Sequence, residues 1–233
     1  MVDQQRLQTA LREFASTLVR RYELGDVLYR FSDDVTDVLG VAGSGVSILD
    51  NGVLRFETAT SDTVEEIERL QDDFGEGPCK DAAETAGSVA AVDLAAFNER
   101  WPKFAPASVE AGLSAVLGIP MHLEGTTIGA LNIYDAAPRP WSDEDMAAAQ
   151  LLADMATAYI MMVGQLRSAE QLADQLQDAL DSRVVIEQAK GALARGLDID
   201  VSTAFELLRR HARNNQRKLH DVAAEVIEGT LRL

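Results

Sequence analysis

A regular spacing of apolar residues in the second half of the chain limits its fold more than any other feature. Between residues 155 and 180, apolar side chains recur in alternating steps of four and three residues: Met155, Tyr159, Met162, Leu166, Ala169, Ala173, Leu176 and Leu180. This is the a/d spacing of a two-stranded coiled coil. We expect a long helix that pairs with a second copy of the chain through residues 155–180. The alternative is a helix packed along its own domain.

Two strand–turn–strand patterns precede this helix. Asp50-Asn51-Gly52 separates residues 46–49 from 53–58, and Glu124-Gly125-Thr126 separates residues 116–123 from 127–134. An Asn-Gly step favours a tight hairpin because both residues accept positive φ. The sequence therefore predicts two antiparallel hairpins.

Helical patterns flank these hairpins. Apolar residues recur with helical spacing over residues 4–37, including Leu18, with an interruption near Gly25; residues 63–73 form a shorter helix and residues 88–92 a strand. Ser142 and Asp145 have the spacing of a capping box at the start of the long helix. We predict an α+β domain over residues 1–162, with an antiparallel sheet flanked by helices.

The last fifty residues have no strand pattern. We expect a coiled-coil connector over residues 163–182 and a small bundle of three helices over 183–233, with helices at about 183–195, 203–214 and 219–229. Gly196 suits the end of the first, and Thr203 with Glu206 suits a capping box on the second. The expected core residues are Ile186, Ala189, Leu193, Phe205, Leu208, Ala212, Val222, Ala223, Val226 and Ile227.

Charge is distributed unevenly along the chain. The net charge of −17 argues against nucleic-acid binding by overall electrostatics. Residues 181–233, however, hold nine basic and eight acidic residues, a net of +1, whereas the other 180 residues hold 12 and 30, a net of −18. This asymmetry indicates two parts with different partners.

A basic segment carries the functional argument. Residues 209–218 contain five basic side chains and no acid: Arg209, Arg210, Arg213, Arg217 and Lys218. The first three are spaced to crowd one side of a helix, and Lys190 of the preceding helix can join them. Phosphate is the natural counter-charge, because the guanidinium fork matches its oxygens. The alternative is a solvated basic surface.

The residues for an enzyme are not arranged for catalysis. His122, His211 and His220 lack metal-binding spacing, and Gly43-Ser44-Gly45 lacks a dinucleotide fingerprint. Cys79, the one cysteine, is predicted to lie in a loop, where it is either a thiol activated by Lys80 or a buried, inert residue. We predict neither an enzyme nor a metal site, and no cofactor is identified.

The amino terminus has no export signal, and the most apolar stretch, residues 146–164, contains Asp154. We therefore expect no membrane span and a cytoplasmic protein.

The carboxyl-terminal sequence resembles the ANTAR domain, a three-helix RNA-binding module of bacterial transcription antiterminators. The resemblance covers about residues 180–230 and rests on the run from Arg183 to Leu193 (RVVIEQAKGAL) together with Ala204-Phe205, Leu208-Arg209, Ala212-Arg213 and Val222-Ala223. Ala194 departs from the family, which commonly has Met there, and this difference concerns packing.

The ANTAR resemblance implies that this region binds paired stem-loops in nascent mRNA and keeps a terminator from forming. Lys190, Arg209, Arg210, Arg213 and Lys218 are then expected to hold RNA phosphates. Arg183, Ala189 and Gly191 are expected to allow close approach to unstacked loop bases.

The amino-terminal part, about residues 14–162, resembles a GAF domain of the kind found ahead of ANTAR in actinobacterial regulators. The matching residues are Gly75-Glu76-Gly77-Pro78-Cys79, Asp93-Leu94, Arg100-Trp101-Pro102, Gly118-Ile119-Pro120 and Gly129–Tyr134. This resemblance implies a sensory domain that binds a small molecule or a partner protein, without specifying which.

Together these features predict a signal-responsive, RNA-binding antitermination regulator that forms a homodimer. Four alternatives remain: a DNA-binding regulator, a GAF small-ligand sensor acting through protein partners, an enzyme built on the GAF pocket such as a thiol reductase, and a dimerisation scaffold.

Overall fold

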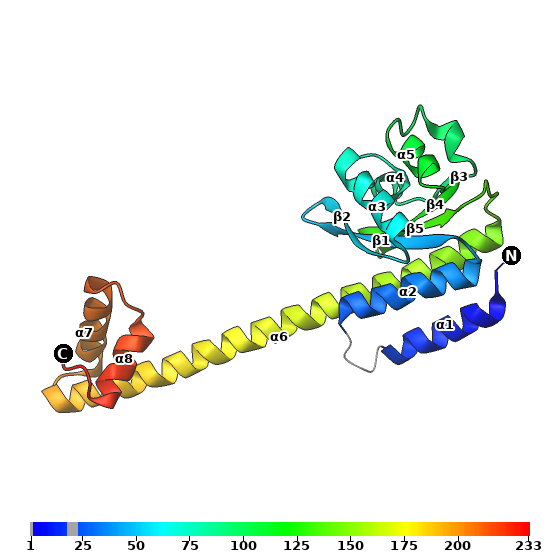
Figure 1. Cartoon of the computed structure of the whole chain (residues 1–233). Coiled ribbons are helices and arrows are strands. Elements are labelled where there is room, and N and C mark those ends of the chain that lie inside the picture. Colours follow the sequence, from blue (N-terminus) through cyan, green and yellow to red (C-terminus); the bar gives the residue numbers. More distant parts are fainter. Residues whose placement is uncertain (1, 18–22) are drawn as a thin grey trace. The chain divides into compact units, whose positions relative to one another are not determined.

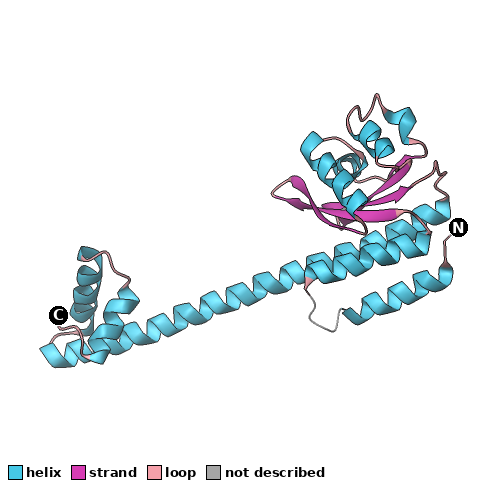
Figure 2. Cartoon of the chain, in the orientation of Figure 1, coloured by secondary structure: helices cyan, strands magenta, loops and turns pink. Residues whose placement is uncertain are grey.

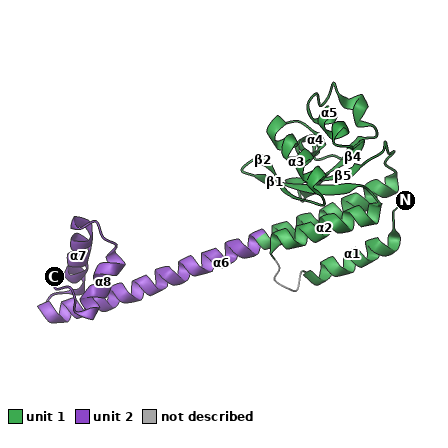
Figure 3. Cartoon of the chain, viewed as in Figure 1, with its two compact units in different colours: residues 1–163 green, residues 164–233 purple. Residues whose placement is uncertain are grey.

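The computed structural model describes residues 2–17 and 23–233, and the chain divides into two compact units between Val163 and Gly164 (Figure 3). Helix α6 (Asp143–Leu197) contributes its first part to unit 1 and the rest to unit 2. The predicted connector, residues 163–182, therefore lies inside a single helix. Leu18, a predicted helical position, falls outside the described residues.

Unit 1 is built on an antiparallel sheet of five strands in the order β2-β1-β5-β4-β3 (Figure 1). The strands are β1 (Gly43–Asp50), β2 (Val53–Ala59), β3 (Val89–Ala91), β4 (Ala115–Leu123) and β5 (Thr126–Asp135). Both predicted hairpins are confirmed. Their turns have positive φ at Asn51 (51°) and Gly52 (82°), and at Glu124 (51°) and Gly125 (81°), which is why glycine occupies the second position of each.

One face of the sheet packs against α2 (Leu24–Leu39) and the first part of α6, and α1 (Gln4–Thr17) packs against these two helices (Figure 2). The predicted interruption near Gly25 is confirmed to within two residues, because Glu23 is extended and α2 begins at Leu24. Gly40 ends α2 in the left-handed conformation (φ 59°).

The other face of the sheet carries α3 (Asp62–Phe74), α4 (Pro78–Thr85), the short 3₁₀ helix η1 (Leu94–Phe97) and α5 (Phe104–Glu110). Ser61 caps α3 by accepting a hydrogen bond from the Val64 amide. The sequence analysis missed α4 and α5, which are too short for a periodic pattern. Cys79 accordingly lies in a helix rather than the predicted loop, directly after Pro78 at the first helical position.

A half-buried arginine fixes the start of α6 in unit 1. The Arg139 guanidinium donates to Asp135 Oδ2 (3.0 Å), Asp145 Oδ1 (3.1 Å) and the carbonyl of Leu39 (3.0 Å). The predicted capping box is confirmed, because the Asp145 amide donates to Ser142 Oγ (3.1 Å) and the Ser142 amide donates to Asp145 Oδ2 (3.1 Å). Burial acts to raise the pKa of Asp145, but the Ser142 hydrogen bonds and the Arg139 charge outweigh it and lower that pKa.

The beginning of the predicted coiled-coil seam belongs to the core of unit 1. Tyr159 is 2% exposed and its ring lies 5.7 Å from that of Phe14, and Met155 packs against the same core. These two residues are therefore occupied within the chain, which corrects the predicted extent of the seam. Beyond them the seam positions are exposed, by 47% at Leu166, 57% at Leu176 and 58% at Leu180.

Unit 2 is formed by the end of α6, α7 (Val201–Asn214) and α8 (Leu219–Glu228). The predicted helix at residues 183–195 is the last part of α6, Gly196 is helical, and Asp198 takes the left-handed conformation (φ 54°). The second helix begins earlier than predicted: Asp200, not Thr203, is its cap and accepts a hydrogen bond from the Thr203 amide (2.9 Å).

The core of unit 2 consists of Ala189, Leu193, Ala204, Leu208, Ala212, Val222 and Ala223. Ile186 and Val226 pack against it, as predicted. Two expected core residues do not belong to it, because Phe205 is half-buried and Ile227 is 42% exposed.

Helix α6 is long and apolar enough to pass a membrane-span test by length and composition, with a mean hydropathy of 1.4 over its most apolar window. Leu152, Ala156 and Tyr159, however, are buried against α1, α2 and the sheet. This part of α6 is thus a core helix of unit 1.

Candidate nucleic-acid interface

The predicted basic residues of unit 2 fall into groups with different surroundings. Lys190 is the least exposed, with 15% of its side chain accessible. Its Nζ donates to both carboxylate oxygens of Glu187 (2.8 and 2.9 Å) and lies 5.0 Å from the ring centre of Phe205. Lys190 therefore links α6 to α7.

Arg209 approaches Phe205 as well, from within α7. Its Cζ lies 5.6 Å from the ring centre, and its Nη1 donates to Glu206 Oε1 (3.0 Å). Lys190 and Arg209 thus share one aromatic ring, and each has a carboxylate partner three residues before it. Cation–π contacts of this kind are worth about 0.5–1 kcal/mol at exposed sites.

Arg210 and Arg213 lie elsewhere on α7. Together with Thr203, Glu206 and Leu207 they line a surface hollow of about 370 Å³. Within the described residues, no carboxylate lies within 4 Å of either guanidinium. Glu206, the acid nearest in the helix, is bound to Arg209 instead.

The segment after α7 also contains one paired and one unpaired cation. Arg217 forms a two-pronged pair with Glu225 of α8, at 2.8 and 2.5 Å, and this pair raises the pKa of Arg217 and lowers that of Glu225. Lys218 is exposed and, over the described part of the chain, has no ion pair. Arg183 on α6 is exposed and unpaired by the same measure.

The two small residues expected near RNA are placed very differently. Ala189 is fully buried in the core of unit 2, so it offers no surface to a ligand, and its role is to let the helices pack closely. This corrects the expectation that Ala189 allows close approach to loop bases. Gly191 is exposed, and a Cβ added there would meet no atom within 4 Å. Spacing places Gly191 on the same helix face as Arg183 and Glu187.

The sequence analysis missed Phe205, Glu187 and Glu206 as members of this surface. Glu187–Lys190 and Glu206–Arg209 have i, i+3 spacing, which is a readable sign of partial neutralisation. The Arg217–Glu225 pair joins the segment between α7 and α8 to α8, and its spacing of eight residues is not one from which a pair can be predicted.

Unit 1 contains a second group of interest, a buried polar network around Glu68. This carboxylate is inaccessible and receives hydrogen bonds from Asn132 Nδ2 (2.8 Å), the Tyr134 hydroxyl (2.8 Å) and Ser47 Oγ (3.3 Å). Burial raises the pKa of Glu68 to about 7, although these hydrogen bonds oppose the shift. Gly45 leaves the room that Glu68 fills, since a Cβ there would lie 2.8 Å from Glu68 Cγ.

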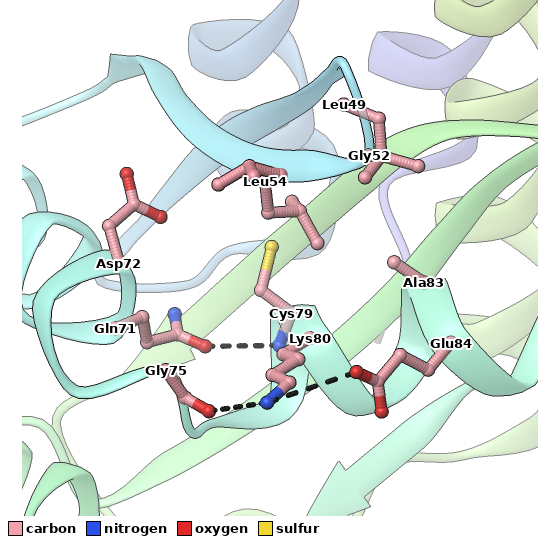
Figure 4. A pocket seen from close by; sticks show the side chains of 11 residues that line it. Leu49, Gly52, Leu54, Gln71, Asp72, Gly75, Cys79, Lys80, Ala83 and Glu84 are labelled. Carbon is pink, nitrogen blue, oxygen red and sulfur yellow. Dashed lines mark hydrogen bonds and ion pairs between the residues drawn. The ribbon is translucent and has the colours of Figure 1, made fainter.

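A cavity of about 440 Å³ lies beside this network, between the β1–β2 hairpin, the end of α3 and α4 (Figure 4). Gln71 joins the two, because its Nε2 donates to the Tyr134 hydroxyl (3.0 Å) and its Oε1 accepts from the Cys79 amide (3.1 Å). The sulfur of Cys79 points toward Leu54 across the cavity.

The thiol of Cys79 is not activated. Burial raises its pKa well above the ordinary value, and the nearby Glu68 carboxylate acts in the same direction. Lys80 does not oppose this, since its Nζ donates to the carbonyl of Gly75 (2.7 Å). Of the two interpretations of Cys79, a thiol activated by Lys80 or a buried, inert residue, these surroundings support the second.

The three histidines have different surroundings. His122 Nδ1 lies 2.8 Å from Thr127 Oγ1, and His211 and His220 are half-buried. The Nδ1 atom of His220 is buried and, within the described part of the chain, has no hydrogen-bond partner. Among the described residues, no group of three or more histidine, cysteine, aspartate or glutamate side chains is placed to hold a metal ion.

Comparison with known proteins identifies both units. The family model of the GAF domain matches residues 23–160, and that of the ANTAR domain matches residues 174–227. No curated protein matches the chain.

Solved structures agree with the GAF fold. The GAF domain of a phosphoenolpyruvate-protein phosphotransferase from Coxiella burnetii aligns with a TM-score of 0.56 and 18% identity, covering 70% of this chain and 98% of that one. A domain of a putative two-component sensor histidine kinase protein from Sinorhizobium meliloti 1021 gives 0.55 and 17%, covering 65% and 99%. Free methionine-R-sulfoxide reductase from Neisseria meningitidis gives 0.53 and 15%, covering 71% and 96%.

At these identities the likeness concerns the fold alone, and the fold occurs in sensors and enzymes. The order of the two matched domains decides the class: this chain belongs to the GAF family and, with its carboxyl-terminal ANTAR domain, is a GAF and ANTAR regulator.

Proposed function

We propose that this protein is a signal-responsive antitermination regulator whose ANTAR unit binds stem-loops in nascent RNA while its GAF unit senses the signal. One observation carries the proposal: on the ANTAR unit, Arg210, Arg213 and Lys218 have no carboxylate partner within the described residues. Like charges three and four residues apart on α7 repel one another, and a bound phosphate removes that cost.

The chemistry of the unpaired residues suits a polynucleotide. A guanidinium binds phosphate through two parallel hydrogen bonds, and Lys218 adds a point charge. Arg183 and Gly191 share one face of α6, where the bare glycine lets a strand approach the helix backbone. Lys190 and Arg209 complete the basic surface, but both must first exchange a carboxylate partner for a phosphate.

The test is a titration of the intact protein with a hairpin RNA at several salt concentrations. Arg213→Gln and Arg217→Gln remove the same charge, yet only Arg217 is paired, with Glu225. We expect Arg213→Gln to weaken binding about tenfold and to reduce the salt slope by about 0.7–0.9, as for one lost phosphate contact. Because Arg217 is already paired with Glu225, we expect Arg217→Gln to change the salt slope by less than about half of the change caused by Arg213→Gln.

Three results would contradict this proposal. Equal effects of the two variants would mean that the ion pairs do not select the RNA-binding residues. Preference for duplex DNA at matched salt would favour a DNA-binding regulator. Affinity that does not depend on salt would leave a GAF sensor acting through protein partners, or a scaffold.

We also propose that the chain forms a homodimer through α6 beyond Met162. Leu166, Leu176 and Leu180 occupy a/d positions and expose large apolar side chains, which a second copy would bury. A dimer also presents two ANTAR units to paired stem-loops, and tethering raises the apparent affinity by roughly 10²-fold.

Charge placed on or off this seam tests the dimer. Leu176→Lys introduces a charge at a seam position, whereas Gln171→Lys introduces the same charge on the outer face of the helix. Sedimentation should show that only Leu176→Lys dissociates the dimer. A monomeric parent protein would contradict the homodimer directly.

The proposed target places the protein in the cytoplasm, where transcripts are made. The GAF unit is the proposed receiver of the signal, either a small molecule or a partner protein.

A further inference from the structure

The cavity of unit 1 has walls that accept an apolar group. Leu49, Val53 and Leu54 of the β1–β2 hairpin line one side, and Ala83 of α4 faces them. Val53 is 55% exposed, so apolar surface is also present at the mouth of the cavity.

The floor of the cavity offers few free hydrogen-bonding groups and no charge. Gln71 Nε2 donates one of its two hydrogens to the Tyr134 hydroxyl, and Gln71 Oε1 accepts from the Cys79 amide. Burial raises the pKa of the Cys79 thiol, so the thiol gives a charged ligand no partner. A charged group at the floor would lose its hydration without an opposite charge beside it, and we therefore expect the part of the ligand that enters to be apolar.

The rim carries two carboxylates and one occupied ammonium. Lys80 Nζ donates to the Gly75 carbonyl (2.7 Å) and lies 3.8 Å from Glu84 Oε1, as the dashed lines of Figure 4 show. Asp72 Oδ2 accepts the Phe56 amide (2.8 Å), and within the described chain no cation lies within 4 Å of this carboxylate. Partial burial raises the pKa of Asp72, although the Phe56 amide and the more distant charges of Arg55 and Arg69 act in the opposite direction. A cation placed directly beside Asp72 would stabilise its charged form further.

We propose that this cavity binds a small organic cation, with an aromatic or branched apolar body inside and its ammonium group at Asp72. This rests on the proposed role of the GAF unit as a sensor and names the chemistry of the ligand. Anionic ligands are disfavoured, since a phosphate or carboxylate at the rim would meet Asp72 and Glu84 within a unit whose net charge is −16, from 11 basic and 27 acidic residues.

Three probes that share the indole ring separate the effect of ligand charge from that of apolar burial. Tryptamine adds a side chain with an ammonium group to this ring, indole-3-acetate adds one with a carboxylate, and indole has no side chain and no charge. Calorimetry on the intact protein, without RNA, should give the order tryptamine, indole, indole-3-acetate, with the first binding at least about tenfold tighter than the last.

Neighbouring carboxylates of α3 provide a matched pair of variants. Asp72→Asn keeps an acceptor for the Phe56 amide but removes the charge, whereas Asp73→Asn removes the same charge outside the cavity. We expect Asp72→Asn to weaken tryptamine about fivefold and to leave indole unchanged, with less than about a twofold effect of Asp73→Asn. Ala83→Leu narrows the cavity and should weaken the binding of tryptamine and of indole together.

The proposal is overturned if indole-3-acetate binds as tightly as tryptamine, if Asp72→Asn and Asp73→Asn act alike, or if none of the probes saturates the protein by about 10 mM. Because the hairpin-RNA titration is a separate measurement on the other unit, failure here leaves the RNA-binding proposal standing, and the reverse also holds.

Discussion

Arginine serves opposite purposes in the two units. In unit 1, Arg139 is 15% accessible and joins the end of α2, the end of β5 and the first turn of α6 through carboxylates and carbonyls. In unit 2, Arg210 and Arg213 are exposed and, in the part of the chain described, have no carboxylate partner. The first arrangement stabilises a fold, and the second leaves cations available to an anion that is not part of the chain.

The charge of each unit matches this division. Unit 1 has a net charge of −16, while unit 2, with 10 basic and 11 acidic residues, has a net of −1. Although unit 2 is nearly neutral, its charges are unevenly paired. Its acidic residues form ion pairs with Lys190, Arg209 and Arg217, and the other basic residues of the surface have no such partner among the described residues. Net charge alone is therefore a poor guide to nucleic-acid binding here.

The largest expected effect separates the two kinds of arginine. Arg139→Met leaves Asp145, whose side chain is 5% accessible, without its cation, and should lower the free energy of unfolding of unit 1 by about 3 kcal/mol. Arg213→Met removes an exposed side chain and should change stability by less than about 0.5 kcal/mol. Urea unfolding followed by circular dichroism measures both, and similar losses would abolish the distinction.

The buried carboxylate of unit 1 gives the next largest effect, as a dependence on pH. The pKa of Glu68 is raised from 4.5 to about 7 in the folded state, so the folded protein holds this proton more tightly than the unfolded chain. Stability should consequently fall as pH rises through this window, by roughly 2 kcal/mol. Unfolding measured between about pH 5 and pH 8 should show this fall in the parent protein and a smaller one in Glu68→Gln.

Asp34, whose pKa is raised to about 6 chiefly by burial, contributes with the same sign in both proteins. The difference between them thus isolates Glu68. An identical pH dependence in the two would show that Glu68 is ionised throughout this range.

A pair of glycines in α6 sharpens the comparison at the RNA surface. A Cβ added at Gly191 or Gly196 meets nothing within 4 Å, so either alanine variant should stabilise the helix by up to about 1 kcal/mol. Only Gly191 shares a face with Arg183, and only Gly191→Ala should weaken hairpin-RNA binding, about fivefold. Unchanged binding in Gly191→Ala would exclude a close approach at that point.

The smallest expected effect concerns Phe205, the ring shared by Lys190 and Arg209. Because the ring is half-buried, Phe205→Leu should cost unit 2 less than about 1 kcal/mol, mainly through lost cation–π contacts. Thermal unfolding provides the measurement. A loss above about 3 kcal/mol would instead place Phe205 among core residues, as the sequence suggested.

Local signals made much of the fold predictable. Asn51-Gly52 predicts the first hairpin because few residues tolerate two successive positive φ angles. Ser142 and Asp145 predict the start of α6 through their capping-box spacing. The short helix α4 escaped notice, since eight residues are too few for a periodic pattern. Tyr159 lies in the core of unit 1 and not on the predicted dimer seam. Heptad spacing could not show this, because it does not distinguish a helix packed on its own domain from one packed on a second copy of the chain.

The candidate site was only partly predictable. The basic composition of α7 and the resemblance to the ANTAR domain predict which surface binds RNA, but which of its cations are neutralised depends on their carboxylate partners. Glu187 and Glu206 could be read from spacing, whereas the pairing of Arg217 with Glu225 depends on how α7 and α8 meet. Ala189 shows a second reason why the site was only partly predictable. It belongs to the motif that resembles the ANTAR domain, but it is buried and serves helix packing.

Residues 164–181 of α6 are all exposed, and the two hydrophobic cores that use this helix lie before and after them. Within one copy of the chain, this stretch contributes its length and helical phase, and the identity of its apolar residues matters for the proposed dimer. An insertion of seven residues returns the helix to within about 20° of its original rotation, whereas five residues turn it by about 140°. We therefore expect another sensory unit joined upstream of the same ANTAR bundle to act on it only when the helical phase is kept.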